Sequence, residues 1–158
     1  MLKRIAIRLV LTPAMIALTF GAAAPAADSD IGGIWRVSRY FCSDCGTRAF
    51  KEFGAAIQFT GQDITNPISD NCAAHPDYTL LREVSTKKLL TSEGKSWPTS
   101  FRRALVAHSK VRYGFITCGG INYMQLLVAT PKRSFYFFEG GIVFELDREL
   151  NPGAGPAK

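Results

Sequence analysis

The stretch 110-KVRYGFITCGGINYMQLLVATPKRSFYFFEGGIVFEL-146 decides the fold class of this chain of 158 residues. Its apolar runs are separated by Gly119-Gly120, by Thr130-Pro131-Lys132-Arg133 and by Gly140-Gly141. Paired glycines, and a proline at the second position of a turn, are typical of tight connections and bends between antiparallel strands. The stretch therefore predicts strands at Lys110–Cys118, Ile121–Ala129, Ser134–Phe138 and Ile142–Leu146.

The residues before this stretch continue the β pattern. Trp35, Val37 and Phe41 alternate with other side chains, which predicts a strand that starts at Gly33 and has one exposed face. A period of two also returns twice further along the chain. The pattern predicts additional strands at 56–60 and 78–84, and a long loop rich in Asp, Asn, Ser and Pro at 62–76.

Three segments interrupt the strand pattern. Ser85 stands where the N-cap of a short helix over 86–90 would lie, and Gly94 ends that run. Residues 47–53 predict a short helix or an irregular turn, and Ser100–His108 fits a short helix as well as an edge strand.

Short strands with turn signals at intervals of about 8–12 residues favour a mainly β fold. We expect an antiparallel up-and-down β-barrel or a β-sandwich, with one or two short helices.

The first 26 residues have the composition of a cleavable export signal. Lys3 and Arg4 precede an apolar run at 9–20, and Ala24 and Ala26 supply the small residues of a cleavage site. The run is too short to cross a bilayer, which takes about 20 apolar residues, so we expect no stable membrane insertion. An uncleaved interfacial anchor is the alternative. We predict a signal at 1–26, a single domain at 27–150, a flexible tail at 151–158, and a periplasmic or secreted location in a bacterium.

Four cysteines follow the predicted signal, and an even number in an exported chain predicts two disulfides. Three pairings are open, of which we favour Cys72 with Cys118 and Cys42 with Cys45. Zinc is a competing hypothesis, because Cys42, Cys45, Cys72 and His75 have the ligand types and paired spacing of a structural site. A redox Cys-x-x-Cys is the other, although the alternating βαβ pattern of a thioredoxin-type fold does not follow it. Export favours disulfides and no bound metal or cofactor.

The charge of the chain gives no signature of nucleic-acid binding. The formal charge is +6, and it falls to +3 when Lys3, Arg4 and Arg8 leave with the predicted signal. A charge of that size on a domain of this length is ordinary for solubility. The basic pairs Lys87-Lys88, Arg102-Arg103 and Lys132-Arg133 are scattered along the sequence, so we expect each to be a solvated loop or face.

Two features at the ends of the predicted domain resemble the lipocalin-type barrels of the calycin group. Gly33-Ile34-Trp35 is similar to the family's G-x-W at the start of the first strand, and Arg148 follows the last strand. The resemblance implies that Trp35 plugs the closed end of a barrel of about eight strands and that Arg148 packs over its indole. The resemblance covers only these ends, and the long loop and the Cys-x-x-Cys depart from the family's plan.

No catalytic group stands out in the sequence. His75 and His108 are the only histidines, and neither accompanies a recognised nucleophile motif. Glu139, next to Gly140-Gly141 and an aromatic run, would suit a pocket mouth, although a carboxylate that faces solvent at a bulge is the commoner arrangement. A roomy barrel would have an apolar cavity. We predict that its lining consists of Tyr113, Phe115, Tyr123, Phe135, Phe137 and Phe144.

These observations favour a non-catalytic binding protein that acts as a monomer and holds a small hydrophobic ligand in a barrel. The alternative is a periplasmic inhibitor of a lysozyme or protease, which would act through exposed loops or through the segment 27–32. A ligand binder should show an apolar cavity of several hundred Å³, whereas an inhibitor should show a filled core and a protruding loop or terminus. A purely structural envelope protein would show neither.

Overall fold

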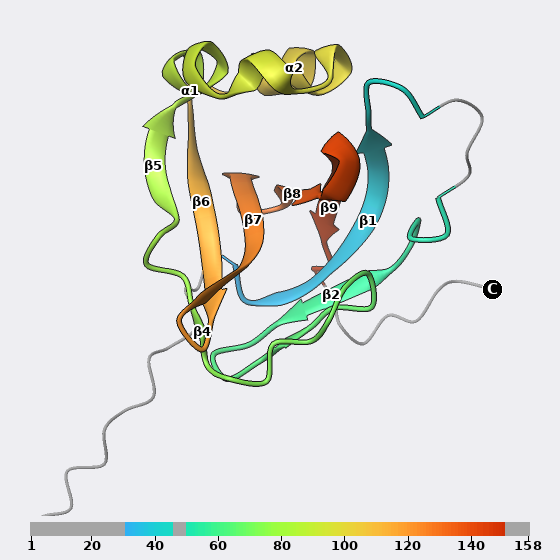
Figure 1. The fold of residues 1–158 in the computed structure, drawn as a ribbon, viewed down its shortest axis with the longest axis vertical. Helices are drawn as coiled ribbons and strands as arrows, with labels where there is room; N and C mark the ends of the chain where they lie inside the picture. The colour runs from blue at the N-terminus through green and yellow to red at the C-terminus, as the bar shows by residue number, and fades with distance from the viewer. Residues whose placement is uncertain (1–30, 46–49, 151–158) are drawn as a thin grey trace, which may run out of the picture.

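The computed structural model describes residues 31–45 and 50–150. The predicted signal, the predicted tail and part of the predicted helix or turn at 47–53 therefore lie outside the described residues. Strands make up most of the regular structure, as predicted (Figure 1). In chain order the elements are β1 (Gly33–Phe41), β2 (Ala56–Phe59), β3 (Ile64–Thr65), β4 (Pro76–Asp77), β5 (Arg82–Ser85), α1 (Thr86–Ser92), a 3₁₀ turn (Gly94–Ser96), α2 (Thr99–Leu105), β6 (Lys110–Cys118), β7 (Ile121–Thr130), β8 (Arg133–Phe138), a 3₁₀ turn (Glu139–Gly141) and β9 (Ile142–Arg148).

The strands form one antiparallel sheet that curls into a nearly closed barrel. Its order is β3-β2-β1-β9-β8-β7-β6-β4, with β5 also paired to β6. The predicted strand at 78–84 is shorter than expected, because only its end pairs with β6 as β5. Barrel closure removes most of the unpaired strand edges that an open sheet would expose. The prediction of a barrel is therefore confirmed over the alternative of an open sandwich.

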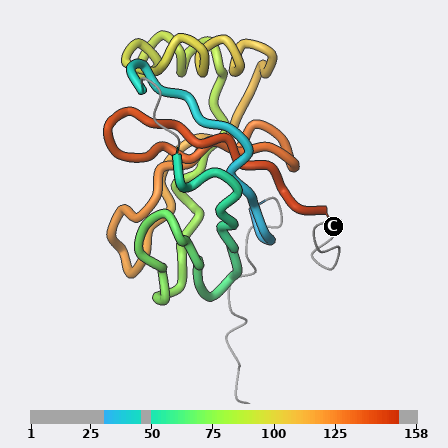
Figure 2. The backbone as a smooth tube through the Cα atoms, turned by 90° about the vertical axis from the view of Figure 1, so that its right-hand side faces the viewer, coloured from blue at the N-terminus to red at the C-terminus, as the bar shows by residue number. Residues whose placement is uncertain are grey.

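Helices α1 and α2 lie in one layer across the strands, as the side view in Figure 2 shows. The ambiguous segment Ser100–His108 is helical over most of its length, because α2 spans Thr99–Leu105. Phe101 and Leu105 on this helix are fully buried, four residues apart, which places both on the face toward the sheet. Among the described residues, no helix is long and apolar enough to cross a bilayer.

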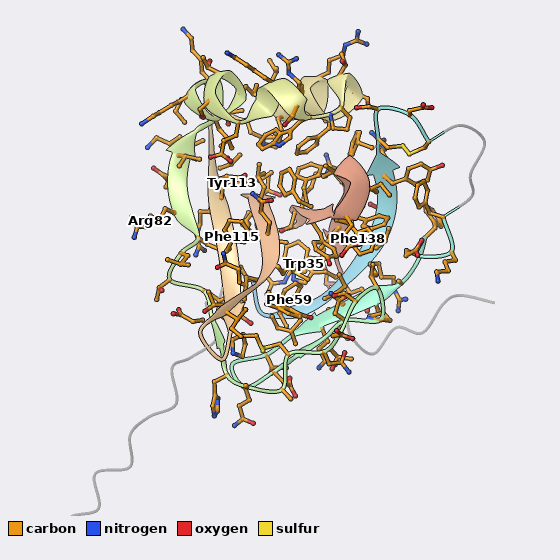
Figure 3. All side chains as sticks on the ribbon, viewed as in Figure 1. Trp35, Phe59, Arg82, Tyr113, Phe115 and Phe138 are labelled. Carbon is orange, nitrogen blue, oxygen red and sulfur yellow. A yellow bond between two sulfur atoms is a disulfide. The ribbon has the colours of Figure 1, made fainter. Side chains whose placement is uncertain are left out.

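The two faces of the sheet carry two separate apolar cores. The barrel core fills the inside and contains Trp35, Ile57, Phe59 and Phe144, all at most 2% exposed. The helix-side core lies between the outer face of the sheet and the helices. Figure 3 shows Trp35 and Phe59 within the barrel and Tyr113 beneath the helices. The helix-side core consists of Phe41, Leu89, Phe101, Leu105, Val111, Leu127, Phe135 and Val143, with Trp97, Tyr113 and Phe137 packed against it.

A β-bulge lets β1 contribute to both cores. The pairing of β1 with β9 shifts register between Val37 and Arg39. Before the shift, Trp35 and Val37 belong to the barrel core; after it, Phe41 belongs to the helix-side core, and Tyr40 packs against the barrel core instead. An extra residue reverses the side on which the following side chains stand, because side chains alternate along a strand.

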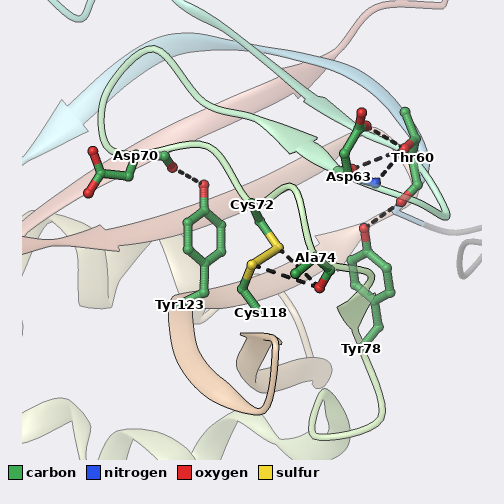
Figure 4. Close-up of a disulfide and its surroundings, with 8 residues drawn as sticks. All are labelled: Thr60, Asp63, Asp70, Cys72, Ala74, Tyr78, Cys118 and Tyr123. Atoms are coloured by element: carbon green, nitrogen blue, oxygen red, sulfur yellow. Dashed lines mark hydrogen bonds between the residues drawn. A yellow bond between two sulfur atoms is a disulfide. The ribbon is translucent and has the colours of Figure 1, made fainter.

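The barrel is closed by two different joints. At the first, which we call the ladder seam, β1 and β9 pair from Trp35 and Arg148 to Phe41 and Val143. At the second, the disulfide seam, no strand ladder joins β3 to β4 among the described residues. Instead Ile64 exchanges two backbone hydrogen bonds with Cys72, at 2.8 and 2.9 Å, and Cys72 is bonded to Cys118 at the end of β6 (Figure 4).

Two tyrosines reinforce the disulfide seam. The Tyr78 hydroxyl donates a hydrogen bond to the Thr60 carbonyl oxygen at 2.9 Å, and the Tyr123 hydroxyl donates to the Asp70 carbonyl oxygen at 2.5 Å (Figure 4). Both bonds tie a strand or loop on the β6 side to the long loop region. This seam therefore depends on side chains where the ladder seam depends on backbone.

Both predicted disulfides are confirmed, Cys42 with Cys45 and Cys72 with Cys118. The zinc hypothesis is wrong for this state of the protein, because sulfur atoms joined in disulfides are not the thiolates that bind zinc. The thioredoxin-type alternative also fails, since the sheet is antiparallel throughout.

Candidate functional site

A pocket of about 660 Å³ opens at the end of the barrel where β1 finishes and β9 begins. We call it the mouth pocket. It lies at the opposite end of β1 from Trp35, because Trp35 pairs with Arg148 whereas Phe41 pairs with Val143. Its volume is within the range of small-molecule sites, about 300–1,000 Å³. The lining residues are Cys42, Ser43, Asp44, Cys45, Phe50, Glu52, Ser96, Phe138, Glu139, Gly140, Gly141, Ile142 and Phe144.

The floor of the mouth pocket is aromatic. The ring centroids of Phe138 and Phe144 are 5.7 Å apart, and those of Phe50 and Phe144 are 6.1 Å apart. The Tyr40 ring contacts that of Phe50 at a tilt of 55°, with a centroid distance of 4.2 Å. These spacings are typical of tilted and edge-to-face aromatic pairs, which hold their rings in defined orientations. The floor is therefore apolar and continuous with the barrel core, with Phe138 half-buried and Phe50 and Phe144 buried.

The rim carries negative charge. Asp44 and Glu139 are exposed and Glu52 is half-buried, and the described lining includes no lysine or arginine. Glu139 thus occupies the pocket mouth suggested by the sequence and also faces solvent. Its turn requires glycine, because Gly140 and Gly141 have φ of +70° and +75°. The rim combines this turn with the loop that the Cys42–Cys45 disulfide closes.

An aromatic floor and an acidic rim together favour a cationic ligand with an apolar body. A ring face attracts a cation electrostatically, and carboxylates in a partly enclosed mouth raise the local concentration of positive charge. Serine hydroxyls at Ser43 and Ser96 supply additional hydrogen-bonding groups at the edge. Within the described residues, no group of three His, Cys, Asp or Glu side chains is arranged to hold a metal ion.

The six aromatic residues predicted to line one cavity do not come together. Tyr113, Phe135 and Phe137 belong to the helix-side core, whereas Tyr123 and Phe144 pack in or against the barrel core. Phe115, on β6, is 36% exposed. Only Phe144 lines the mouth pocket. The structure therefore divides these six side chains between the two faces of the sheet.

The barrel interior is filled by side chains. Met124, Leu126 and Ile116 are at most 2% exposed and pack with Trp35. Burial also raises the pKa of Tyr113, in the helix-side core, and its hydroxyl hydrogen-bonds the Glu93 carboxylate. Both observations are those of packed structure, so neither the barrel interior nor the surroundings of Tyr113 offers the space that the mouth pocket has.

The closed end of the barrel has the contact that the lipocalin resemblance implies. The guanidinium carbon of Arg148 lies 5.6 Å from the Trp35 ring centroid, and Arg148 also donates a hydrogen bond to the Gly32 carbonyl oxygen. The Trp35 indole donates to the Ile31 carbonyl oxygen at 2.7 Å. Residues 31 and 32, the described part of the predicted protruding segment, therefore pack against the barrel end.

Other charged and titratable groups serve local structure. Glu145, the buried carboxylate of the described residues, lies 2.9 Å from Arg133 and 3.6 Å from Arg39. His75 is exposed in the loop that follows Cys72, and His108 is half-buried after α2. No pair of these groups forms a nucleophile and base arrangement of the kind used in acyl transfer.

Sequence reasoning missed most of the mouth pocket. Asp44 lies inside the Cys-x-x-Cys ring, and Glu52 and Phe50 follow it closely, so their meeting with the β8–β9 turn depends on tertiary structure. The adjacency of Glu139 to two glycines was the one signal available. The pairing of first and last strands then brings that turn beside the Cys42–Cys45 loop.

Comparison of the chain with protein-family models, with curated proteins and with solved structures finds no match. The likeness to lipocalin-type barrels is therefore one of architecture and of Gly33, Trp35 and Arg148 at the closed end.

Proposed function

We propose that this protein is an exported, non-catalytic binding protein of the lipocalin type, whose mouth pocket takes a small ligand with an apolar body and a positive charge. The observation that carries the proposal is the union of a Phe50, Phe138 and Phe144 floor with an acidic rim in one pocket of about 660 Å³. A ligand that is only hydrophobic would use the floor and leave the carboxylates without a partner.

Export to a periplasmic or extracellular space belongs to the same proposal. Two disulfides are typical of oxidising compartments, and they accompany the signal composition of residues 1–26. The lipocalin-type relation draws support from the nearly closed barrel and from the Arg148 contact with Trp35. A monomer is expected, since the barrel leaves few strand edges unpaired.

The test compares three probes of similar size: 4-phenylbutylammonium, 4-phenylbutanol and 4-phenylbutyrate. Each is titrated into isotope-labelled oxidised protein, and amide chemical shifts report the place and strength of binding. We expect the ammonium probe to bind tightest, the alcohol more weakly and the carboxylate weakest, with shift changes centred on Cys42–Cys45 and Glu139–Ile142. Equal binding of all three probes, no binding of any, or shift changes centred elsewhere would overturn the proposal.

Variants separate the rim from the floor. Asp44→Asn with Glu139→Gln should weaken ammonium binding by roughly tenfold and leave alcohol binding unchanged, because only charge is removed. Phe138→Ala should weaken both probes, because the floor loses apolar area. Glu83→Gln is the matched control, since it removes an exposed carboxylate from β5, outside the pocket lining. Because the control removes one charge and the rim variant removes two, a loss of binding free energy in the control about half as large as that in the rim variant would show that only net charge matters.

Inhibition of a lysozyme or protease is the second candidate function. The filled barrel interior favours it, and the two loops at the mouth would receive a basic side chain of the enzyme in place of a free ligand. The same rim variant would then abolish inhibition of the purified enzyme, and none of the three small probes would bind.

A further inference from the structure

The segment that contains both helices is rich in positively charged side chains. Between residues 86 and 110 six lysines and arginines accompany one carboxylate, that of Glu93. Glu93 accepts a hydrogen bond from the Tyr113 hydroxyl at 2.5 Å. Lys110 is paired with Glu83 on β5 at 2.7 Å, so the remaining five cations and one carboxylate give the segment a positive net charge, in a domain that is only weakly basic as a whole. The six cations are Lys87, Lys88, Lys95, Arg102, Arg103 and Lys110.

Helix geometry turns these side chains outward. Thr86 and Leu89 form the buried side of α1, as Phe101 and Leu105 form that of α2. Residues one and two positions beyond a buried helical residue point away from the same partner, since a turn takes 3.6 residues. The pairs 87–88 and 102–103 are accordingly exposed, and nitrogen-tipped side chains project from the outer side of the layer in Figure 3.

The fold therefore corrects the expectation that the basic pairs are scattered. Lys87-Lys88 and Arg102-Arg103 are 14 or more residues apart in sequence but lie on one layer. The backbone N–H of Thr86 donates a hydrogen bond to the Ser109 carbonyl oxygen at 3.1 Å, which joins the start of α1 to the segment after α2. Among the described residues, no carboxylate forms a salt bridge with Lys87, Lys88, Arg102 or Arg103. Lys132-Arg133 lies elsewhere, and Arg133 pairs with Glu145.

Apolar surface is set among these cations. A pocket of about 430 Å³ is lined by Thr86, Lys87, Leu90, Val106, His108 and Ser109. Val106 is 70% exposed and lies beside the half-buried Leu90 in this pocket, which makes the two side chains a small apolar patch. The layer thus offers both fixed positive charge and exposed hydrocarbon at its outer face.

We propose that the outer face of this helical layer docks onto the surface of a bilayer that contains anionic phospholipids. The lysines and arginines contact the lipid phosphates, and Val106 with Leu90 enters the boundary between headgroups and acyl chains. The contact is peripheral, because both helices have only seven residues and remain packed on the sheet by their other sides. The mouth pocket's carboxylates belong to other elements, and the pocket meets the helical layer at Ser96, between the two helices.

An anionic bilayer fits this face better than a nucleic acid or an acidic protein segment does. All three match the charge, but only the bilayer also offers hydrocarbon beside its phosphates, at the place where Val106 is exposed. Trp97 is half-buried, and its ring packs edge-on or tilted against Phe101, Tyr113 and Phe137 at the helix-side core, so the layer presents no open aromatic face on which bases would stack. Charge and exposed aliphatic surface together therefore point to lipid.

The experiment is co-sedimentation of the oxidised protein with two kinds of vesicle: phosphatidylglycerol mixed with phosphatidylcholine in equal parts, and phosphatidylcholine alone. We expect binding to the first kind only, weaker at higher salt. Arg102→Gln with Arg103→Gln should reduce the partition coefficient roughly 25-fold at low salt, at about fivefold for each cation. Val106→Ser should reduce it several-fold without changing its salt dependence.

The matched control is Lys51→Gln with Lys132→Gln, which removes two exposed charges from other elements and should change the partition coefficient by less than about threefold. Thermal unfolding confirms that each variant is folded. The proposal is overturned if vesicles of phosphatidylcholine alone bind equally, if the control falls as far as the arginine variant, or if a duplex DNA of arbitrary sequence displaces the protein from the anionic vesicles.

Discussion

The two seams of the barrel close the same sheet by opposite means. At the ladder seam β1 and β9 pair through backbone hydrogen bonds, and Arg148 packs over Trp35 at the closed end. At the disulfide seam one residue of β3, Ile64, pairs with Cys72 in a loop, and one covalent bond carries the connection to β6. The ladder seam is held by many backbone hydrogen bonds, whereas the disulfide seam depends on one disulfide and a few side-chain hydrogen bonds.

The difference teaches where a small barrel needs a cross-link. A barrel of this size buries limited apolar surface, so a break in its hydrogen-bonded ring is costly. The disulfide lies at that break, while the second disulfide closes a short loop at the mouth pocket. We therefore expect the two seams to respond differently to substitution.

The largest effect should come from the disulfide seam. Replacing Cys72 and Cys118 by serine releases a loop with a sequence separation of 46 residues, which costs about 4 kcal/mol of unfolding free energy on the chain-entropy model. The corresponding change at Cys42 and Cys45, with a separation of 3, should cost about 2 kcal/mol. Denaturant unfolding of both double variants measures the difference. Equal losses would mean that the seam does not depend on its covalent bond.

The ladder seam should be less sensitive to the loss of one side chain. Arg148→Met keeps the length of the side chain but removes the cation over the Trp35 ring and the hydrogen bond to Gly32, which should cost about 1–2 kcal/mol. Arg36→Met is the control, because Arg36 lies on the same ladder with its side chain half exposed, and should cost less than about 1 kcal/mol. Thermal melts compare them. A loss at Arg148 that exceeds the loss at the Cys72–Cys118 disulfide would reverse the ranking of the seams.

The smallest effect should be a pH dependence at the disulfide seam. Burial raises the pKa of Tyr123, so folding favours its protonated hydroxyl, which donates to the Asp70 carbonyl oxygen. Its contribution, about 1 kcal/mol or less, is present below the unfolded pKa of about 10 and is lost as the pH rises beyond it. The stability gap between the natural protein and Tyr123→Phe should therefore shrink above pH 10. A gap that stays constant across this range in urea titrations would exclude the effect.

The sequence predicts the fold class and both cross-links because those signals are local. Turn residues such as Gly119-Gly120 and Thr130-Pro131 mark the strand ends, and an even cysteine count after a segment with the composition of an export signal predicts disulfides. The disulfide seam was not predictable, since the contact of Ile64 with Cys72 joins residues of a loop that has no strand pattern.

The faces of the sheet were the hardest feature to predict. In β8, Phe135 and Phe137 belong to the helix-side core while Tyr136 and Phe138 belong to the barrel core. An alternating pattern identifies the buried face only when the other face is polar. Here both faces are buried, the inner one in the barrel core and the outer one under the helices. The mouth pocket was missed for a related reason, because its floor draws on Phe138 and Phe144 from the barrel side alone.

The ladder seam also sets the order of events in folding. It joins the first described strand to the last, and a contact such as that of Arg36 with Glu149 spans 113 residues. Contacts of such large sequence separation form late, because the entropy of closing a long loop must be overcome first. The barrel therefore cannot close until β9 has become available. In a chain that crosses a membrane from its N-terminus, the edge of β1 that pairs with β9 would stay unpaired until the last strand had crossed.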